Sequence, residues 1–515
     1  MEDSIEDATI DAEEDFAPPP MQISYEVLDG ITQDAGFLDD DDHESCSLSD
    51  EIASAINKEK NKVVFGEAGK DFVDVLFSFL TLPLGTIARL VAKEEKDLQP
   101  VKVGSLSSLY SSVANLDESE YLTTETCKEM LLQPRNSMEP YIKKMKLNID
   151  DTKPTTYYVC NNIRRCRHHQ TKVEASTFSN KQCSYCGELC AKTISPLFSA
   201  DVFDGFVKSG VAFLISDELK VVPISMDAMC DMFKDSGTDD MRPVEQVTVN
   251  VTKKQVLELL KISLVSKTTL SYAFLEKKPS IWTFLSPIRL FDIASKGGSS
   301  SKKIEVKVVQ RKSDSRILFV QGKKDFADML YSFLTFPLGA VVKLLEGNSC
   351  MGSMDALYNS IVGLSEDYFV SKEVKDMLVS PLLAPQFKLS NQIIPLDESH
   401  APTYYFDTAL GYHYLSTCRG CEALELDMFD PTDNGGSEKG FAKGPTLYFA
   451  TDDLIVTPML SISIISPLNS TNTPICDLVE KMVSIGSRIL KASLTTTSAL
   501  TTGLNHLFSK VKEEK

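Results

Sequence analysis

The sequence predicts an α+β protein of two tandem homologous copies, each with a helical part and a β-rich part, preceded by a disordered acidic tail. Three observations lead to this prediction: a fifteen-residue motif occurs twice, the hydrophobic pattern within a copy changes from helical to strand-like periodicity, and acidic residues are concentrated at the N-terminus. The chain has 515 residues, of which 43% are apolar and 24% charged. This is the balance of a globular protein with two to four domains.

The N-terminal segment differs in charge from the rest of the chain. Residues 1–51 contain 18 of the 73 acidic residues and neither lysine nor arginine. The remainder is nearly neutral, with 55 acidic and 53 basic residues. Because so many like charges cannot gather around a small apolar core, we expect residues 1–60 to be a disordered tail. Its scattered apolar residues are compatible with a partner-binding segment, and the alternative is a solubilising extension.

We expect the protein to be intracellular, cytoplasmic or nuclear, and not secreted. The N-terminus lacks the basic start and apolar stretch of a secretory signal. The longest apolar run, at residues 75–88, is interrupted by Ser78, Thr81 and Pro83 and is too polar for a membrane span. The 12 cysteines should then stay mostly reduced.

The repeated motif defines the domain organisation. DFVDVLFSFLTLPLG at residues 71–85 recurs as DFADMLYSFLTFPLG at residues 325–339, with eleven of fifteen positions identical. Further matches follow in the same order, among them residues 205–223 with residues 440–458. The pattern indicates a tandem duplication.

Copy one comprises residues 61–285 and copy two comprises residues 303–509. Residues 286–302 between them contain the stretch SKGGSSS and are predicted to be a flexible linker. Each copy is large enough to bury its own core. We therefore expect two similar globular halves that can pack on each other.

The opening of each copy is predicted to be β-structure. Copy two begins with a hairpin of residues 304–309 and 316–320. Copy one begins with a strand at residues 62–65 and lacks the first hairpin strand, which would leave an open edge unless residues 51–57 replace it.

The repeated motif is predicted to be a helix that is buried on most sides, because its apolar residues leave little polar face. Asp71 is predicted as its N-cap and Asp74 as a charge that favours its N-terminus. Pro83 should end it, and Gly85 should allow close packing.

The rest of copy one changes from helical to strand periodicity and back. We expect helices at residues 105–115 and 124–132, a hairpin of residues 211–215 with 220–224, a helix at 226–233, a strand at 244–251, and a helix at 252–264 capped by Thr252.

Five cysteines fall within residues 160–190, and they predict a zinc knuckle. Cys183 and Cys186, followed by Gly187, have the C-x-x-C-G pattern of a turn whose backbone amides point to the sulfurs. Cys160 and Cys166 could complete a tetrahedral site, although the spacing of this pair is wider than usual. The alternative ligands are His168, His169 and Cys190.

Zinc would be structural and confined to copy one. Copy two has only Cys418-x-x-Cys421 in the corresponding region, so a set of reduced surface thiols is the alternative interpretation. Four thiolates leave no open position for water, so this metal would not imply an enzyme. Arg164, Arg165 and Lys181 surround the knuckle, so nucleic-acid binding is a further alternative, although this basic patch is small.

No catalytic residue is predicted. The segment 66–70 is similar to a phosphate-binding loop but has two residues between its glycines instead of four, so we expect a turn before a capped helix. None of the six histidines repeats between the copies, which excludes a Ser-His-Asp or Cys-His pair in both. Asp71 with Asp74 is explained as a helix start rather than as a catalytic carboxylate pair.

The segments DFVDVLFSFLTLPLG, CKEMLLQP, KPTTYYVC and GFVKSGVAFLISDELKVVP resemble the plant family catalogued as domain of unknown function 674. The resemblance covers residues 61–509 and implies tandem copies and cysteine pairs matching Cys160, Cys166, Cys183 and Cys186. It implies no activity, cofactor or catalytic residue. This chain departs from the family in its opening strand, replaced by the tail, and in the cysteines that copy two lacks.

Three functions follow as hypotheses. The first is a non-catalytic scaffold that binds an unidentified protein partner through the surfaces of its two copies. The second is a nucleic-acid or transcription adaptor that uses the zinc knuckle and the tail, and it predicts salt-dependent binding. The third is an enzyme with a site between the copies, since clefts between domains are common ligand sites.

Overall fold

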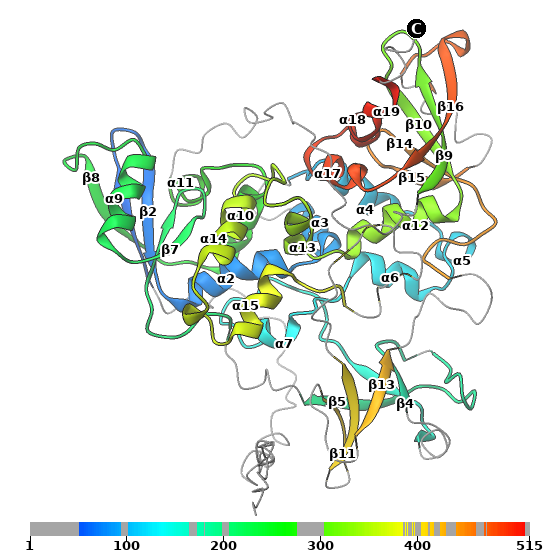
Figure 1. Ribbon diagram of the computed structural model, residues 1–515, viewed down its shortest axis with the longest axis horizontal. Coiled ribbons are helices and arrows are strands. Elements are labelled where there is room, and N and C mark those ends of the chain that lie inside the picture. The colour runs from blue at the N-terminus through cyan, green and yellow to red at the C-terminus, as the bar shows by residue number, and fades with distance from the viewer. Residues whose placement is uncertain are drawn as a thin grey trace, which may run out of the picture. The chain divides into compact units, whose positions relative to one another are not determined.

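The structure is a computed structural model (Figure 1). It describes residues 51–93, 101–163, 172–179, 181–197, 205–275, 303–384, 403–409, 412–416, 423–428, 439–459 and 471–509, with a few single positions between them. The predictions for residues 1–50 and for the linker 286–302 lie outside the described residues. Helices and strands are both abundant, and the predicted α+β class is confirmed.

Sheet one has five antiparallel strands from the first part of the chain, in the order β7-β6-β2-β1-β8. Strand β1 is formed by residues predicted to belong to the tail. The predicted tail boundary at residue 60 is therefore wrong, because folded structure begins earlier. This strand supplies the hairpin partner that copy one was expected to lack. The strands are β1 (Ile52–Asn57), β2 (Lys62–Ala68), β6 (Phe213–Ser216), β7 (Val221–Pro223) and β8 (Val244–Val249).

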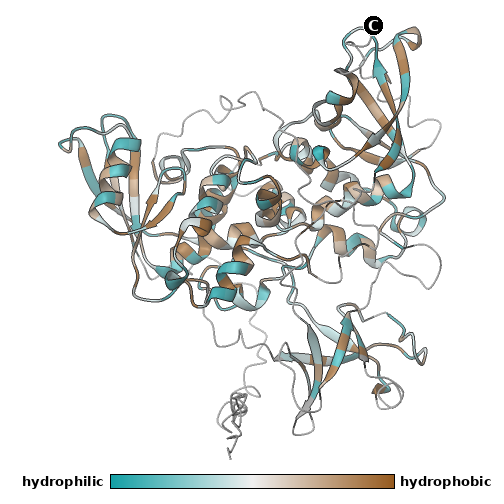
Figure 2. Ribbon diagram, in the orientation of Figure 1, coloured by the Kyte–Doolittle hydropathy of each residue, from teal (hydrophilic) through white to brown (hydrophobic). Residues whose placement is uncertain are grey.

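Sheet two is formed by copy two and has the equivalent order, β15-β14-β10-β9-β16, again with antiparallel pairing throughout. Hydrophobic and charged residues alternate along the first part of β9, from Ile304 to Val308 (Figure 2), as expected for a strand with two different faces. The predicted hairpin is confirmed as β9 with β10. The strands are β9 (Ile304–Arg311), β10 (Ile317–Gly322), β14 (Tyr448–Thr451), β15 (Val456–Pro458) and β16 (Leu478–Ile485).

The helices predicted for copy one are present where the hydrophobic periodicity places them, and further short helices at residues 118–121, 139–142 and 269–274 were not predicted. Helix α2 is buried from Phe72 to Thr81 and ends before Pro83, which precedes α3. A side chain at Gly85 would meet the carbonyl oxygens of Leu131 and Leu334, so close packing requires this glycine. The helices are α2 (Lys70–Thr81), α3 (Leu84–Ala92), α4 (Leu106–Ala114), α5 (Glu118–Tyr121), α6 (Thr126–Leu132), α7 (Glu139–Ile142), α9 (Met226–Asp235), α10 (Lys253–Ser263) and α11 (Thr269–Phe274).

Copy two repeats this helical order. After β10 come two helices separated by a 3-10 helix and a proline, then three helical segments, and then the group that follows strand β15. They are α12 (Lys324–Ser332), the 3-10 helix η3 (Phe333–Thr335), α13 (Leu338–Leu344), α14 (Met354–Gly363), the 3-10 helix η4 (Glu366–Tyr368), α15 (Lys372–Val379), the 3-10 helix η6 (Ile475–Asp477), α17 (Arg488–Thr495), α18 (Ala499–Leu504) and α19 (His506–Ser509).

The copies exchange helices. Helix α14 of copy two contacts β7 of sheet one, and α4 of copy one contacts β15 of sheet two (Figure 1). One hydrophobic core runs through both copies and includes Phe77 and Phe369, whose stacked rings have centroids 6.2 Å apart. The copies are therefore not two separate globular halves, because a helix of each copy packs against the sheet of the other copy.

A third β-structure is a closed six-stranded barrel to which each copy contributes three strands. Pairing is antiparallel within a copy and parallel where the copies meet, at β12 with β5 and at β13 with β4. Val159, Phe406 and Leu415 belong to its core. The strands are β3 (Tyr157–Val159), β4 (Lys172–Ser176), β5 (Lys192–Leu197), β11 (Tyr404–Ala409), β12 (Tyr412–Ser416) and β13 (Leu424–Met428).

In the part of the chain that the structure describes, every helix is too short or too polar to cross a bilayer.

Candidate metal centre

The candidate metal centre begins at the end of barrel strand β3. Cys160 follows Val159 directly and is 3% exposed. The backbone amide of Asn162 donates a hydrogen bond to the Cys160 sulfur at 3.3 Å, and the amide of Asn161 donates to the Leu189 carbonyl at 3.1 Å. The barrel strand thus brings the first sulfur beside the segment that contains the other cysteines.

The C-x-x-C-G segment forms the predicted turn. The Gly187 amide donates to the Cys183 carbonyl at 2.9 Å, and the Cys183 amide donates to the Glu188 carbonyl at 2.8 Å. Gly187 has a φ of +72°, a left-handed conformation that glycine adopts without strain. Its role in relieving the backbone is therefore confirmed.

The sulfurs of three cysteines lie close together at this turn. Those of Cys160, Cys183 and Cys186 all lie within 4.8 Å of one another, and the sulfurs of Cys160 and Cys186 are 3.3 Å apart. A disulfide bond would need a separation of about 2.05 Å, so no disulfide joins these cysteines in the structure. Four sulfurs bound tetrahedrally to zinc at about 2.3 Å lie roughly 3.8 Å from one another. The three sulfurs lie close enough to one another that the cluster could hold a metal ion.

Cys190 packs against the same cluster. It is fully buried, and its amide donates to the Lys181 carbonyl at 2.8 Å. Burial, followed by the electrostatic effect of the neighbouring Cys183 and Cys160 side chains, raises the pKa of its thiol to about 12. A metal ion beside this thiol would favour its deprotonation, because a coordinating thiol loses its proton to the metal.

The structure therefore places the predicted ligands as follows. It brings together the sulfurs of three of the four, Cys160, Cys183 and Cys186, and it buries Cys190, named only as an alternative, in the same cluster but outside the group of three sulfurs that lie within 4.8 Å of one another. The remaining candidates lie outside the described residues; they are Cys166, His168 and His169.

An acidic residue of the barrel supports the turn. The Glu174 carboxylate, on β4, accepts hydrogen bonds from the Ser184 amide at 3.0 Å and from the Ser184 hydroxyl. Ser184 lies between Cys183 and Cys186, so this contact orients the turn that presents both sulfurs. Contacts of this kind around a metal site set the orientation of the ligands.

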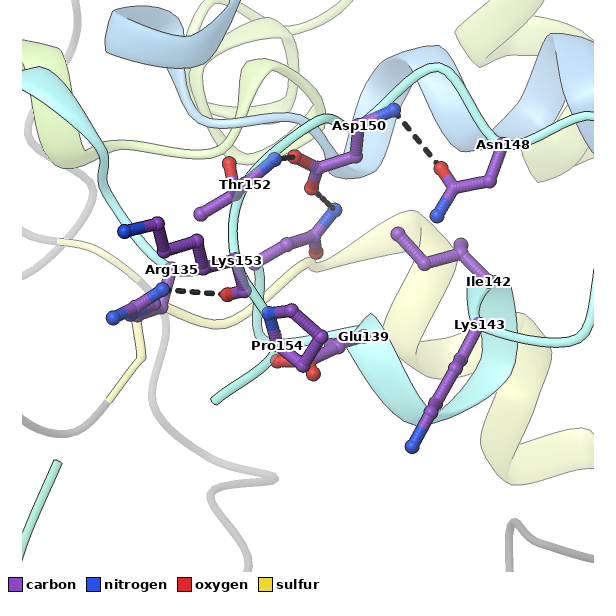
Figure 3. Close-up of a pocket in the computed structure, with 10 residues that line it drawn as sticks. Arg135, Glu139, Ile142, Lys143, Asn148, Asp150, Thr152, Lys153 and Pro154 are labelled. Carbon is purple, nitrogen blue, oxygen red and sulfur yellow. Dashed lines mark hydrogen bonds between the residues drawn. The ribbon is translucent and has the colours of Figure 1, made fainter. Parts of the chain in front are cut away.

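Apart from the thiol cluster, the described part of the chain contains a small cavity beside α7 (Figure 3). Its polar groups bond to one another: the Asn136 amide and the Thr152 backbone amide donate to Asp150, at 3.4 and 3.0 Å, and the Arg135 guanidinium donates to the Lys153 carbonyl at 2.6 Å. These bonds fasten the chain that leads to β3, so we assign the cavity a structural role.

The start of the repeated motif differs from the prediction. Helix α2 begins at Lys70 with Gly69 as its N-cap, so the prediction that Asp71 is the N-cap is wrong. Gly66 lies in strand β2, so the predicted turn at that position is wrong as well. Both differences arise because β2 continues almost to the start of the helix.

Asp74 is buried and does not serve as a helix-terminal charge. Its carboxylate accepts hydrogen bonds from the amides of Phe206 at 2.8 Å and Val207 at 2.9 Å, and Lys70 pairs with it at 2.6 Å. Burial raises its pKa to about 6, against the lowering effect of Lys70. The sequence contained one signal of this buried role, namely a second aspartate in a helix that is otherwise almost entirely apolar.

The equivalent carboxylate of copy two is Asp328. It accepts a hydrogen bond from the Ala442 amide at 2.7 Å, pairs with Lys324 at 3.1 Å, and likewise has a pKa raised to about 6 by burial. In both copies the carboxylate fixes the backbone of a G-F-x-K segment, at residues 205–208 in copy one and 440–443 in copy two. We therefore assign these carboxylates to the fold and not to catalysis.

Together the two sheets, the shared barrel and the thiol cluster define an α+β protein with a candidate cysteine metal centre. Residues 51–488 match the family described as protein of unknown function (DUF674), and the chain belongs to this family. The match begins next to β1, and the predicted family is confirmed. No curated protein and no solved structure matches the chain.

Proposed function

We propose that this protein is a non-catalytic intracellular plant protein that acts as a scaffold for a protein partner, and that a structural zinc ion fastens the end of its barrel. The proposal rests on one observation, the meeting of Cys160, Cys183 and Cys186 in one cluster. An all-thiolate zinc site has no open coordination position, so its role is to hold structure.

We assign the four ligands to Cys160, Cys183, Cys186 and Cys190. Cys190 is chosen over Cys166 because it is buried against the other three. Zinc at this position would tie the end of β3 to the C-x-x-C-G turn. Cysteines that no disulfide joins are compatible with the proposed cytoplasmic or nuclear location, where thiols stay reduced.

The metal content of the purified protein tests the site. The full chain, produced without added metal, should contain about one zinc ion per molecule, and the double substitution of Cys183→Ser and Cys186→Ser should abolish it. The matched control is Cys230→Ser with Cys350→Ser, because both of these cysteines are exposed, and this variant should keep the zinc. Metal-free wild-type protein, or zinc retained by the Cys183/Cys186 variant, would reject the site.

Exposed apolar side chains at two sheet ends support the scaffold role. Strands β8 and β16 end their sheets, and Met241 and Met482, at 59% and 65% exposure, lie beside or within them. A strand that ends a sheet and carries apolar side chains is a surface to which an extended peptide can add as another strand.

A peptide selection tests this surface. Random peptides displayed on phage and selected on the full chain should include extended apolar sequences, and Met482→Lys should reduce their binding at least tenfold. Val362→Lys is the control, because Val362 is also exposed, at 47%, but lies on helix α14. Equal binding by both variants would place the peptides elsewhere and reject this edge.

A further inference from the structure

The contacts between the copies are reciprocal where the two repeated motifs meet. The Leu84 amide donates to the Phe336 carbonyl at 2.9 Å, and the Leu338 amide donates to the Leu82 carbonyl, also at 2.9 Å. These are the same contact made twice with the partners exchanged. Such reciprocity is the property of an interface between two identical partners related by a twofold axis.

A second reciprocal contact begins at the G-F-x-K segment of copy one. The Val370 amide donates to the Phe206 carbonyl, and the Lys208 amide donates to the Tyr368 carbonyl, both at 2.9 Å. This segment precedes strand β6 of sheet one in the chain, whereas Tyr368 and Val370 lie between α14 and α15. The two hydrogen bonds therefore join copy one to the helical part of copy two.

The G-F-x-K segment of copy two makes the same contact in the opposite direction. The Thr123 amide donates to the Phe441 carbonyl and the Lys443 amide donates to the Tyr121 carbonyl, again at 2.9 Å. Both hydrogen bonds have the donors, acceptors and spacing of those at the first segment. The contact is thus made twice, once from each copy.

The buried carboxylates support these segments. Asp74 accepts hydrogen bonds from the segment of copy one, and Asp328 accepts one from the segment of copy two, each from within its own copy. The internal ion pairs of each copy therefore fix the backbone that receives the other copy.

A third reciprocal contact lies at the start of the exchanged helices, α4 and α14. The Ser105 amide donates to the Ser493 carbonyl, and the Ser353 amide donates to the Ser263 carbonyl, both at 2.8 Å. Ser105 is the N-cap residue of α4 and Ser353 is that of α14. Each exchanged helix is thus fixed to the other copy at its first turn.

The hydroxyls of the same two serines also cross between the copies. Ser105 donates to the Thr496 carbonyl at 2.7 Å, and Ser353 donates to the Ser266 carbonyl at 2.9 Å. The acceptor lies three residues after the amide acceptor in both cases. The hydroxyl contacts to backbone carbonyls therefore repeat, and Ser353 makes one further contact, to the Thr269 hydroxyl at 2.8 Å.

The glycines before these serines fit the same close approach. Gly104 and Gly352 have φ values of +47° and +44°, and a Cβ at either position would come within 2.4 Å of a carbonyl oxygen of the other copy. Neither position tolerates a larger residue without moving the partner backbone. At these two glycines the backbone of one copy therefore packs directly against the backbone of the other copy.

We propose that the surface between the copies is a self-complementary binding interface whose partner is a second copy of the same fold, and that the interface persists without the covalent link. The reciprocal hydrogen bonds, the shared core and the barrel with three strands from each copy carry this inference. Two chains can then exchange copies, so that copy one of one molecule binds copy two of another. This inference is independent of the proposed zinc site.

Cleavage of the linker in the full chain tests the interface. A protease recognition sequence is placed at residues 295–302, and the folded protein is cut. We expect one particle with the original mass of 57.0 kDa in size-exclusion chromatography with light scattering. Two separate particles of about half that mass in native buffer would overturn the proposal.

Mild variants show whether the reciprocal contacts hold the halves together. In the cut protein, replacing Ser105→Ala and Ser353→Ala removes three hydroxyl hydrogen bonds that cross the interface, one at Ser105 and two at Ser353, and we expect the dissociation constant to rise about tenfold or more. The control is Ser111→Ala on α4, because Ser111 is exposed and its hydroxyl donates to the Ser107 carbonyl within the same helix. An equal effect of both variants would overturn the assignment of the interface.

Exchange between molecules is the last readout. Isotope-labelled and unlabelled cut proteins are mixed, unfolded in urea and refolded, and native mass spectrometry then counts mixed pairs. We expect about half of the particles to combine one labelled and one unlabelled fragment. Recovery of only separate fragments would show that association requires the intact chain and would overturn the proposal.

Discussion

The two copies are alike in the helical body and different at the barrel. In the body, Asp74 with Lys70 and Asp328 with Lys324 make the same buried contacts to the G-F-x-K segments. At the barrel, the described thiol cluster is formed by copy one alone, and the C-x-x-C pair of copy two, at residues 418–421, lies outside the described residues. The comparison separates contacts that serve the fold, which occur twice, from a candidate site that is described once.

The largest effect is expected at the buried ion pairs. Asp74→Ala and Asp328→Ala each leave a largely buried lysine and buried backbone amides without their acceptor, and each should lower the free energy of unfolding by about 3–5 kcal/mol. Urea unfolding followed by circular dichroism measures both. If the copies are equivalent in the body, the two values should agree within about 1 kcal/mol.

The control for this experiment lies on the same helix. Asp71 pairs with Lys146 at 2.6 Å, and the lysine side chain is about half exposed. Asp71→Ala should therefore cost no more than about 1 kcal/mol. A loss at Asp71 as large as that at Asp74 would contradict the role given to the buried carboxylates.

The next effect concerns the candidate site at the barrel. Cys190→Ser should weaken zinc binding about 100-fold or more, because it removes a direct ligand and even the partners of ligands contribute about 10- to 100-fold. Competition with a chromophoric chelator measures the affinity. Cys166→Ser is the matched control and should change the affinity less than about threefold. The reverse result would make Cys166 the fourth ligand.

The pH dependence of stability gives a smaller effect. Burial raises the pKa of Asp74 from 3.8 to about 6, so the folded chain binds this proton more tightly than the unfolded chain. The corresponding stability is complete below about pH 4 and is lost as the pH rises through about 6. Wild-type protein should therefore lose about 2 kcal/mol relative to Asp74→Asn between about pH 4 and pH 7.

Urea unfolding of both proteins at several pH values measures this difference, with Asp328→Asn as the equivalent variant of copy two. The expected curves of the two variants coincide, because burial raises both pKa values to about 6. A wild-type protein that gains stability over Asp74→Asn with rising pH would show that pairing with Lys70, and not burial, sets the pKa.

Local features of this fold could be predicted from the sequence. The helix after Thr252, the hairpin of copy two and the turn at Gly187 depend on residues close together in the chain, and all three are present. Their signals are caps, alternation and a glycine with positive φ, which are properties of short segments.

The exchange of helices could not be predicted in the same way. An apolar face on α4 or α14 shows that a helix is buried, but not which sheet buries it. The role of Asp74 was missed for a similar reason, since its partners Phe206 and Val207 are more than a hundred positions away. Whether Cys166 or Cys190 is the fourth ligand stays a prediction, because spacing alone does not rank the two thiols and Cys166 lies outside the described residues.

The smallest effect tests a difference between the copies within the body. Thr252 forms a capping box with Gln255 at the start of α10, with hydrogen bonds of 3.3 and 2.9 Å, whereas the equivalent α17 starts at Ser487 without a side-chain cap. Thr252→Ala should therefore cost about 1 kcal/mol and Ser487→Ala less than about 0.5 kcal/mol in urea unfolding. Equal losses would mean that both helices are capped alike, and the body of the protein would then be more symmetric than its hydrogen bonds indicate.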